Sequence, residues 1–178
     1  VQMAVTKGMT IMGFADHFPY PEKYNEPYPD CVIPRDVFPV YWEEVIKIQN
    51  QFASKIEILS GIEVDYLPDY TDIQKHELSQ YPFDYVLGSI HILKGFPIDT
   101  TPELTQKALA HFGSEHQFWN QYWDAVISLL DTDICDILGH LDLLKKYLPL
   151  EDYKPFMEKI TYILERIKNE NKAIDFNM

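Results

Sequence analysis

The sequence predicts an α/β protein with a mainly parallel sheet, because short apolar runs alternate with longer segments of helical periodicity. The apolar runs have the composition of buried strands and cover residues 9–14, 56–62, 85–90, 134–139 and 173–177. The helical segments repeat apolar side chains every three or four residues and cover residues 37–52, 71–79, 102–111, 115–130 and 150–167. Parallel neighbours in a sheet need long crossover connections, which helices of this length supply.

The 178 residues are enough for one domain with its own core. A complete eight-fold barrel of strand-helix units takes about 250 residues, so the five units visible in this chain predict either an open sheet or an incomplete barrel. Residues 1–7 resemble the last turns of a helix, and the sequence stops on a strand. We therefore expect further strand-helix units outside the given sequence.

The composition indicates an ordered protein, with 46% apolar and 24% charged residues. A formal net charge of -13 disfavours broad binding to a nucleic-acid backbone, which requires a basic surface. No apolar run reaches the roughly 18 residues of a membrane helix, so we expect no membrane partner. The two cysteines, Cys31 and Cys135, are expected to be buried thiols in a reducing cytoplasm.

Good metal ligands follow four successive predicted strands. His17, Glu63, His91 and His140 each stand at or just beyond the end of one strand. The carboxyl ends of parallel strands meet at one edge of a sheet, where sites are commonly built. A single histidine in such a place is more often a packing residue, but four such residues in order favour a site for zinc, manganese or iron. Asp16, Asp65 and Asp142 stand beside these ligands and are expected to orient the imidazoles by accepting their N–H groups.

Other polar and aromatic residues permit a functional and a structural interpretation. Arg35, in the long segment after the first strand, and Lys94, three residues beyond His91, are candidates to bind a substrate phosphate. Either one could equally be a solvated surface charge. The aromatic residues from 118 to 123 are expected mainly in the core, with Tyr122 and Trp123 as alternative walls of a substrate pocket. The remaining histidines are expected on the surface: His76, His111 and His116.

Four motifs, in this order, resemble the polymerase and histidinol phosphatase (PHP) family, and most closely its histidinol-phosphate phosphatase branch. They read GFADHF at 13–18, GIEVDY at 61–66, FDYVLGSIH at 83–91 and DILGHLDL at 136–143, and AIDFN near the end is similar to a later strand of that family. The resemblance covers essentially the whole chain. It implies a single PHP-type domain over residues 1–178 with a distorted, TIM-like (β/α)7 barrel, whose first and last strand units are missing from this chain.

The resemblance also implies a site and an activity. Up to three divalent ions would be held, with Glu63 bridging two of them, His91 and His140 on the second, and His17 on the third. A hydroxide between the metals would hydrolyse a small phosphorylated metabolite, L-histidinol phosphate, to L-histidinol and phosphate in histidine biosynthesis. The alternatives are a PHP-type phosphoesterase acting on phosphotyrosine or nucleic acid, and a non-catalytic module that lacks part of the metal site.

The family's other ligand motifs, an N-terminal His-x-His segment and a late Asp-x-His motif, do not occur in this chain. We therefore predict that the natural gene encodes a His-x-His segment about 20–40 residues upstream of His17, a distance that one strand-helix unit and its loops would span. Sequencing the complete gene checks this. A native protein that begins at Val1 would contradict it.

Overall fold

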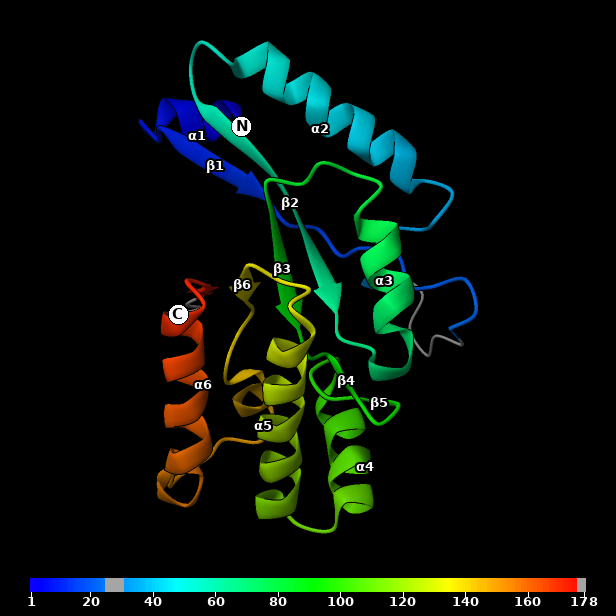
Figure 1. Ribbon diagram of the computed structural model, residues 1–178, viewed down its shortest axis with the longest axis vertical. Coiled ribbons are helices and arrows are strands. Elements are labelled where there is room, and N and C mark those ends of the chain that lie inside the picture. Colours follow the sequence, from blue (N-terminus) through cyan, green and yellow to red (C-terminus); the bar gives the residue numbers. More distant parts are fainter. Residues whose placement is uncertain (25–30, 176–178) are drawn as a thin grey trace. The chain divides into compact units, whose positions relative to one another are not determined.

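The computed structural model describes residues 1–24 and 31–175, and these form two compact units (Figure 1). The first unit comprises Val1–Val64 and Asp72–Leu87, and the second comprises Asp65–Thr71 and Gly88–Met178. Five strands hydrogen-bond in the order β1-β2-β3-β6-β7, and helices separate them along the chain. The predicted α/β class is confirmed.

The amino-terminal half of the chain holds three of these strands. Its elements are α1 (Gln2–Thr6), β1 (Ile11–Phe14), α2 (Phe38–Phe52), β2 (Glu57–Asp65), a 3-10 turn (Pro68–Tyr70), α3 (Thr71–Leu78) and β3 (Tyr85–Ser89). Strand β1 pairs in parallel with β2, with Ile11 opposite Glu57 and Phe14 opposite Ser60. The ends of α2 and α3 agree with the sequence prediction to within one residue.

Strand β2 separates a buried face from a face that carries polar groups. Ile58, Ile62 and Val64 alternate along one face, where Ile62 and Val64 are at most 1% exposed. Gly61, Glu63 and Asp65 alternate on the opposite face, because successive side chains of a strand point to opposite sides. The burial of the aliphatic face thereby fixes the direction in which Glu63 points.

A tyrosine ring takes the space of two missing side chains. A Cβ at Gly13 would lie 2.3 Å from the Tyr85 hydroxyl oxygen, and one at Gly61 would lie 2.1 Å from the ring. Only glycine admits so close an approach. The Tyr85 hydroxyl donates to the Phe14 carbonyl at 2.7 Å, so the ring ties β3 to the end of β1. Burial raises the pKa of Tyr85 and keeps this donor protonated.

The carboxyl-terminal half of the chain begins with a hairpin and ends with a short parallel pair. Its elements are β4 (Ile92–Leu93), β5 (Phe96–Pro97), α4 (Pro102–Phe112), α5 (Glu115–Thr132), β6 (Ile137–Leu138), 3-10 turns at Leu143–Lys146 and Lys154–Phe156, α6 (Met157–Asn169) and β7 (Ala173–Ile174). Helix α5 lies against both α4 and α6 (Figure 1). Strand β6 pairs in parallel with β7.

Local capping residues set the bounds of α4 and α5. The Thr101 hydroxyl accepts from the Leu104 N–H, and the Ser114 hydroxyl accepts from the Gln117 N–H. Gly113, at a φ of 87°, ends α4 immediately before the cap of α5. The core side of α5 is fully buried and consists of Phe118, Trp119, Tyr122, Trp123, Val126, Leu129 and Leu130. The core interpretation of this aromatic segment is confirmed.

Three segments differ from the sequence prediction. The strand expected over 134–139 is ladder-paired with β7 only at Ile137 and Leu138. The helix expected from residue 150 begins at Met157, because Pro155 lacks an N–H and is accommodated in a 3-10 turn before it. The β4–β5 hairpin was not predicted, and Lys94 and Gly95 form its turn with positive φ angles. Residues 176 and 177 of the last predicted strand lie outside the described residues.

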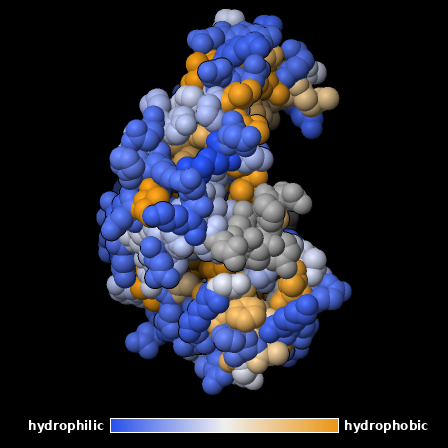
Figure 2. All heavy atoms as spheres, turned by 90° about the vertical axis from the view of Figure 1, so that its right-hand side faces the viewer, coloured by the Kyte–Doolittle hydropathy of each residue, from blue (hydrophilic) through white to orange (hydrophobic). Residues whose placement is uncertain are grey.

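The surface matches the acidic, polar composition. The face shown in Figure 2 is mainly hydrophilic, with small hydrophobic areas between charged groups. His76, His111 and His116 are exposed, as predicted. The free thiol of Cys135 is buried as expected, but that of Cys31 is exposed, so the prediction of two buried thiols is wrong for Cys31. None of the helices in the described part of the chain is long and apolar enough to cross a membrane.

We predict that Gly88→Ala destabilises the fold. A Cβ at residue 88 would lie 2.8 Å from both the Cβ and the sulfur of buried Cys135, and the strand backbone cannot retreat without breaking the bond from the Gly139 N–H to the Gly88 carbonyl. Overpacking of this kind costs about 1–3 kcal/mol. Urea unfolding measures the loss, with exposed Thr161→Ala as the control. A midpoint equal to that of the control would contradict the prediction.

Candidate metal centre

The first pair of predicted ligands, His17 and Glu63, is positioned by a continuation of the β1–β2 ladder. His17 forms an isolated parallel bridge with Glu63 in the same register as β1 and β2. The Glu63 N–H donates to the Asp16 carbonyl at 2.9 Å, and the Phe18 N–H donates to the Glu63 carbonyl at 2.7 Å. Bridged residues point to the same side of a sheet, and His17 Nε2 lies 3.8 Å from Glu63 Oε2. The Glu63 side chain is 12% exposed, so its charge is partly withdrawn from water.

Asp16, beside His17, is fixed by a tyrosine. The Tyr41 hydroxyl, on α2, donates to Asp16 Oδ2 at 2.8 Å. Burial and the bond to Asp16 raise the pKa of Tyr41, so its hydroxyl remains a donor. Asp16 was expected to accept from an imidazole, and in the structure it accepts from Tyr41.

Asp65 and His91 form a carboxylate–imidazole contact in the second unit. Asp65 Oδ1 contacts His91 Nδ1, and the Asp65 side chain is almost fully buried. An ionised Asp65 requires the proton to be on Nδ1, which leaves the lone pair of Nε2 for another partner. This is the arrangement in which a carboxylate orients a metal-binding histidine.

His140 lies against His91 and has an unusual backbone. The two imidazole rings are 4.9 Å apart and cross at 61°. His140 has a φ of 23°, in a region that residues with a Cβ seldom adopt. Its carbonyl accepts from the Tyr122 hydroxyl at 3.0 Å and from the Leu143 N–H at 3.0 Å, so the chain turns sharply after β6.

The other predicted site residues have different partners. Asp142 pairs with Lys145 at 2.8 Å rather than with an imidazole. Arg35 makes a two-pronged pair with Glu77, at 3.0 Å for each prong, and donates to the Tyr20 carbonyl. Lys94 is exposed at the tip of the β4–β5 hairpin.

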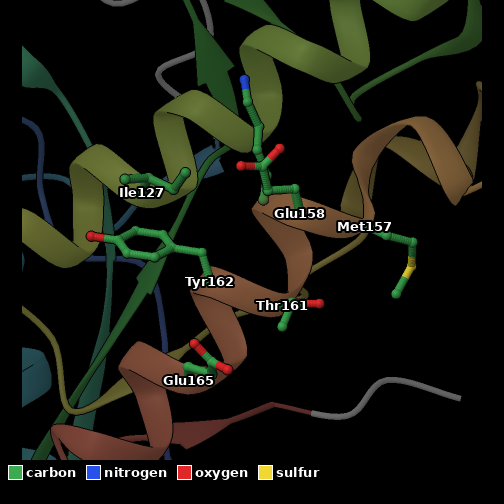
Figure 3. A pocket seen from close by; sticks show the side chains of 7 residues that line it. Ile127, Met157, Glu158, Thr161, Tyr162 and Glu165 are labelled. Carbon is green, nitrogen blue, oxygen red and sulfur yellow. The ribbon is translucent and has the colours of Figure 1, made fainter.

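A groove between α5 and α6 lacks the histidines that occur among the predicted metal ligands. Figure 3 shows its walls, with Ile127 on α5 and Met157, Glu158, Thr161, Tyr162 and Glu165 on α6. Its lining contains no histidine, and Lys159 turns to Asp124 and Asn120. A second, smaller pocket is lined by Arg35, Phe18, Phe38, Glu77 and Tyr81, among others. Neither one contains a predicted metal ligand.

Side chains of the kinds that can bind metal ions are therefore present in two local groups. The first unit joins His17 to Glu63, and the second joins Asp65, His91 and His140. Imidazole nitrogen and carboxylate oxygen suit zinc and related ions, and four of these five side chains are half-buried. The two tyrosines that hold Asp16 and His140, Tyr41 and Tyr122, were not predicted in these roles. Nothing in the spacing of a helix distinguishes a core tyrosine from one whose hydroxyl holds a loop.

Comparison with known proteins shows what the chain is similar to. A family model described as "PHP domain" matches residues 1–178. A protein of Schizosaccharomyces pombe named "Probable histidinol-phosphatase" is 30% identical over 97% of this chain and 58% of its own length. One of the same name from Deinococcus radiodurans is 27% identical over 99% of this chain and 64% of its own length. The chain thus spans about three-fifths of these two curated relatives.

Two solved structures share the fold. HisK from Listeria monocytogenes superposes with a TM-score of 0.88 at 23% identity, covering 99% of this chain and 74% of its own. Histidinol phosphate phosphatase from Lactococcus lactis was solved with zinc, L-histidinol and phosphate. It superposes with a TM-score of 0.76 at 22% identity, covering 99% of this chain and 64% of its own. The PHP-type α/β fold expected from the motifs is confirmed.

We predict that Asp65→Asn weakens metal binding while preserving the fold. Asparagine keeps the size of the side chain but removes the charge that holds the His91 proton on Nδ1. Loss of such an orienting carboxylate typically lowers metal affinity about 10–100-fold. Calorimetric zinc titration of the full-length protein measures the change, with exposed Asp69→Asn as the matched control. Equal affinities for the two variants would show that Asp65 does not act on a metal ligand.

Proposed function

Because the chain belongs to the PHP domain family, we propose that it hydrolyses a phosphomonoester with the help of divalent metal ions, and that its substrate is L-histidinol phosphate. The names of its curated relatives support this, as does the relative solved with zinc, L-histidinol and phosphate. The observation in the chain that carries the proposal is the delivery of imidazoles and carboxylates at successive strand ends, with His17 beside Glu63 and Asp65 beside His91.

His17, Glu63, His91 and His140 are proposed to hold the ions, up to three of them, drawn from zinc, manganese and iron. The donor set fits these metals, and Glu63 has two oxygens with which to bridge. Glu63 and Asp65 are two residues apart on β2, and each has an imidazole contact. The match of the PHP family model to residues 1–178 supports a single domain. We accordingly propose that residues 1–178 function as a single PHP-type domain.

Divalent ions in such a centre supply positive charge to phosphoryl oxygens and make water more acidic. The protein's own groups prepare the ligands for that task. Asp65 holds the proton of His91 on Nδ1 and so presents Nε2. The His17–Glu63 bridge keeps a carboxylate and an imidazole on the same side of the sheet. Glu63, Asp65 and Asp16 are carboxylates beside the proposed histidine ligands, and their negative charge favours the binding of cations.

Arg35 and Lys94, the two candidates for binding the substrate phosphate, differ in how far their charged groups are already paired. The guanidinium of Arg35 already binds Glu77 through two nitrogens and donates to the Tyr20 carbonyl, so fewer of its donors are available to a phosphate. Lys94 follows His91 by three residues on a hairpin with a tight turn, and its ammonium is exposed. We propose Lys94 as the better candidate of the two for binding the substrate phosphate.

Phosphate release from L-histidinol phosphate, phosphotyrosine and a short oligonucleotide distinguishes the substrate classes. The proposal requires the full-length, metal-loaded protein to prefer L-histidinol phosphate. A preference for phosphotyrosine would support the proposed phosphatase activity and contradict the proposed substrate. Absence of both bound metal and activity would support the non-catalytic alternative.

We predict that Glu63→Gln lowers kcat by at least ~100-fold, because an amide cannot supply the charge of a bridging carboxylate, and charge stabilisation contributes on the order of a few kcal/mol. Steady-state kinetics and metal analysis of the full-length enzyme test this together. Asp72→Asn, on the exposed side of α3, is the control and should be silent. Normal turnover with a full metal complement in Glu63→Gln would refute the bridging role.

We also predict that metal stabilisation depends on pH. Protons compete with metal for a ligand imidazole, so added zinc or manganese should raise the melting temperature strongly at pH 7.5 and much less at pH 5.5. His91→Ala and His140→Ala should each lose most of the increment at pH 7.5. Thermal scans of the full-length protein check this. Equal increments in wild type and both variants would place the ions elsewhere.

A further inference from the structure

His140 occupies a strained position that its neighbours must maintain. Its φ of 23° is unfavourable for a residue with a Cβ. Immediately after it, the Leu143 N–H donates to the His140 carbonyl at 3.0 Å, which closes a turn at the start of the 3-10 segment Leu143–Lys146. Histidine adopts a positive φ more often than most residues with a Cβ, but the conformation is still uncommon, so contacts to the turn from other elements help to hold it.

The Tyr122 hydroxyl reaches this turn from another element. It donates to the His140 carbonyl at 3.0 Å and accepts from the Leu143 N–H at 3.3 Å. One oxygen thus contacts both ends of the turn and uses its donor as well as an acceptor site. Tyr122 lies on α5, far from His140 in sequence, and is 1% exposed.

The tyrosine itself has little freedom to move. Its ring packs against Trp119, at 5.7 Å between ring centroids, and against Trp123, at 5.4 Å, and all three residues are fully buried. The helix core therefore holds the hydroxyl at a fixed point beside the His140 backbone.

We propose that Tyr122 is a positioning residue for the metal centre, whose buried hydroxyl fixes the turn at His140 and thereby the direction of the His140 imidazole. The proposal rests on the proposed function, in which His140 binds metal. It also replaces the alternative that Tyr122 forms the wall of a substrate pocket, because the side chain is buried against Trp119 and Trp123.

The test compares two buried tyrosines in the full-length protein. Tyr122→Phe removes the hydroxyl at the turn and keeps the ring. Tyr66→Phe is the matched control, because Tyr66 is 8% exposed in the same unit and its hydroxyl interacts with Ser128 rather than with His140. Each variant removes the hydroxyl of a buried tyrosine, so a merely structural role predicts similar effects of the two on metal binding. His140→Ala is the reference for loss of the ligand.

Cobalt(II) titration followed by visible absorption gives a readout independent of turnover, because the band position and intensity report the ligands around the ion. We expect Tyr122→Phe to lower cobalt and zinc affinity about 10–100-fold and to shift the spectrum towards that of His140→Ala. Tyr66→Phe should retain the wild-type spectrum and affinity. Melting temperatures of the two phenylalanine variants should fall by similar amounts.

The possible contrary results separate the two proposals. If His140→Ala loses metal while Tyr122→Phe binds as wild type does, the positioning role is wrong and the ligand assignment stands. If Tyr66→Phe weakens binding as much as Tyr122→Phe, the effect is general destabilisation and the positioning role is also wrong. If His140→Ala binds cobalt with wild-type affinity and spectrum, His140 is not a ligand and the proposed centre falls with it.

Discussion

The alternation of side chains along β2 is the constraint on which the rest of this structure depends. Ile58, Ile62 and Val64 can be buried only if the strand presents its other face where Glu63 and Asp65 project. A slip of one residue would turn the aliphatic side chains away from the core and turn Glu63 and Asp65 towards it, at a large cost in hydrophobic free energy. The packing of the core therefore decides the orientation of the acidic groups.

Polar contacts then orient the imidazoles of the candidate centre. Each of the three imidazoles has a partner with a fixed position. His17 lies beside Glu63 in a strand ladder, His91 contacts buried Asp65, and His140 lies on a turn that hydrogen-bonds to Tyr122. These partners come from strands and helices, whose own positions are set by packing. The positions of the candidate ligands are thus set by the packing of the hydrophobic core rather than by the loops that carry them.

The sequence predicted the class of fold and the segments of regular structure well, because both follow from the period of the apolar residues. It located helices α2, α3, α4 and α5 closely, since the spacing of their apolar side chains marks each of them. It failed at the β4–β5 hairpin, because a Lys-Gly turn carries a weak signal, and it extended the last helix through Pro155. The strand-end residues were found because their chemical type and order are visible in a sequence. The partners Tyr41 and Tyr122 were missed because tertiary packing alone brings them to Asp16 and His140.

The close fit of the Tyr85 ring over Gly13 and Gly61 has a consequence for the way this protein can vary. Three positions from three strands share a single volume, so a larger residue at either glycine requires a smaller one at position 85. A smaller residue there would also release the Phe14 carbonyl from its hydrogen bond, two residues before Asp16. Evolutionary exchange at these positions should therefore be concerted, and homologues should divide into lineages that keep the whole trio and lineages that have replaced all of it.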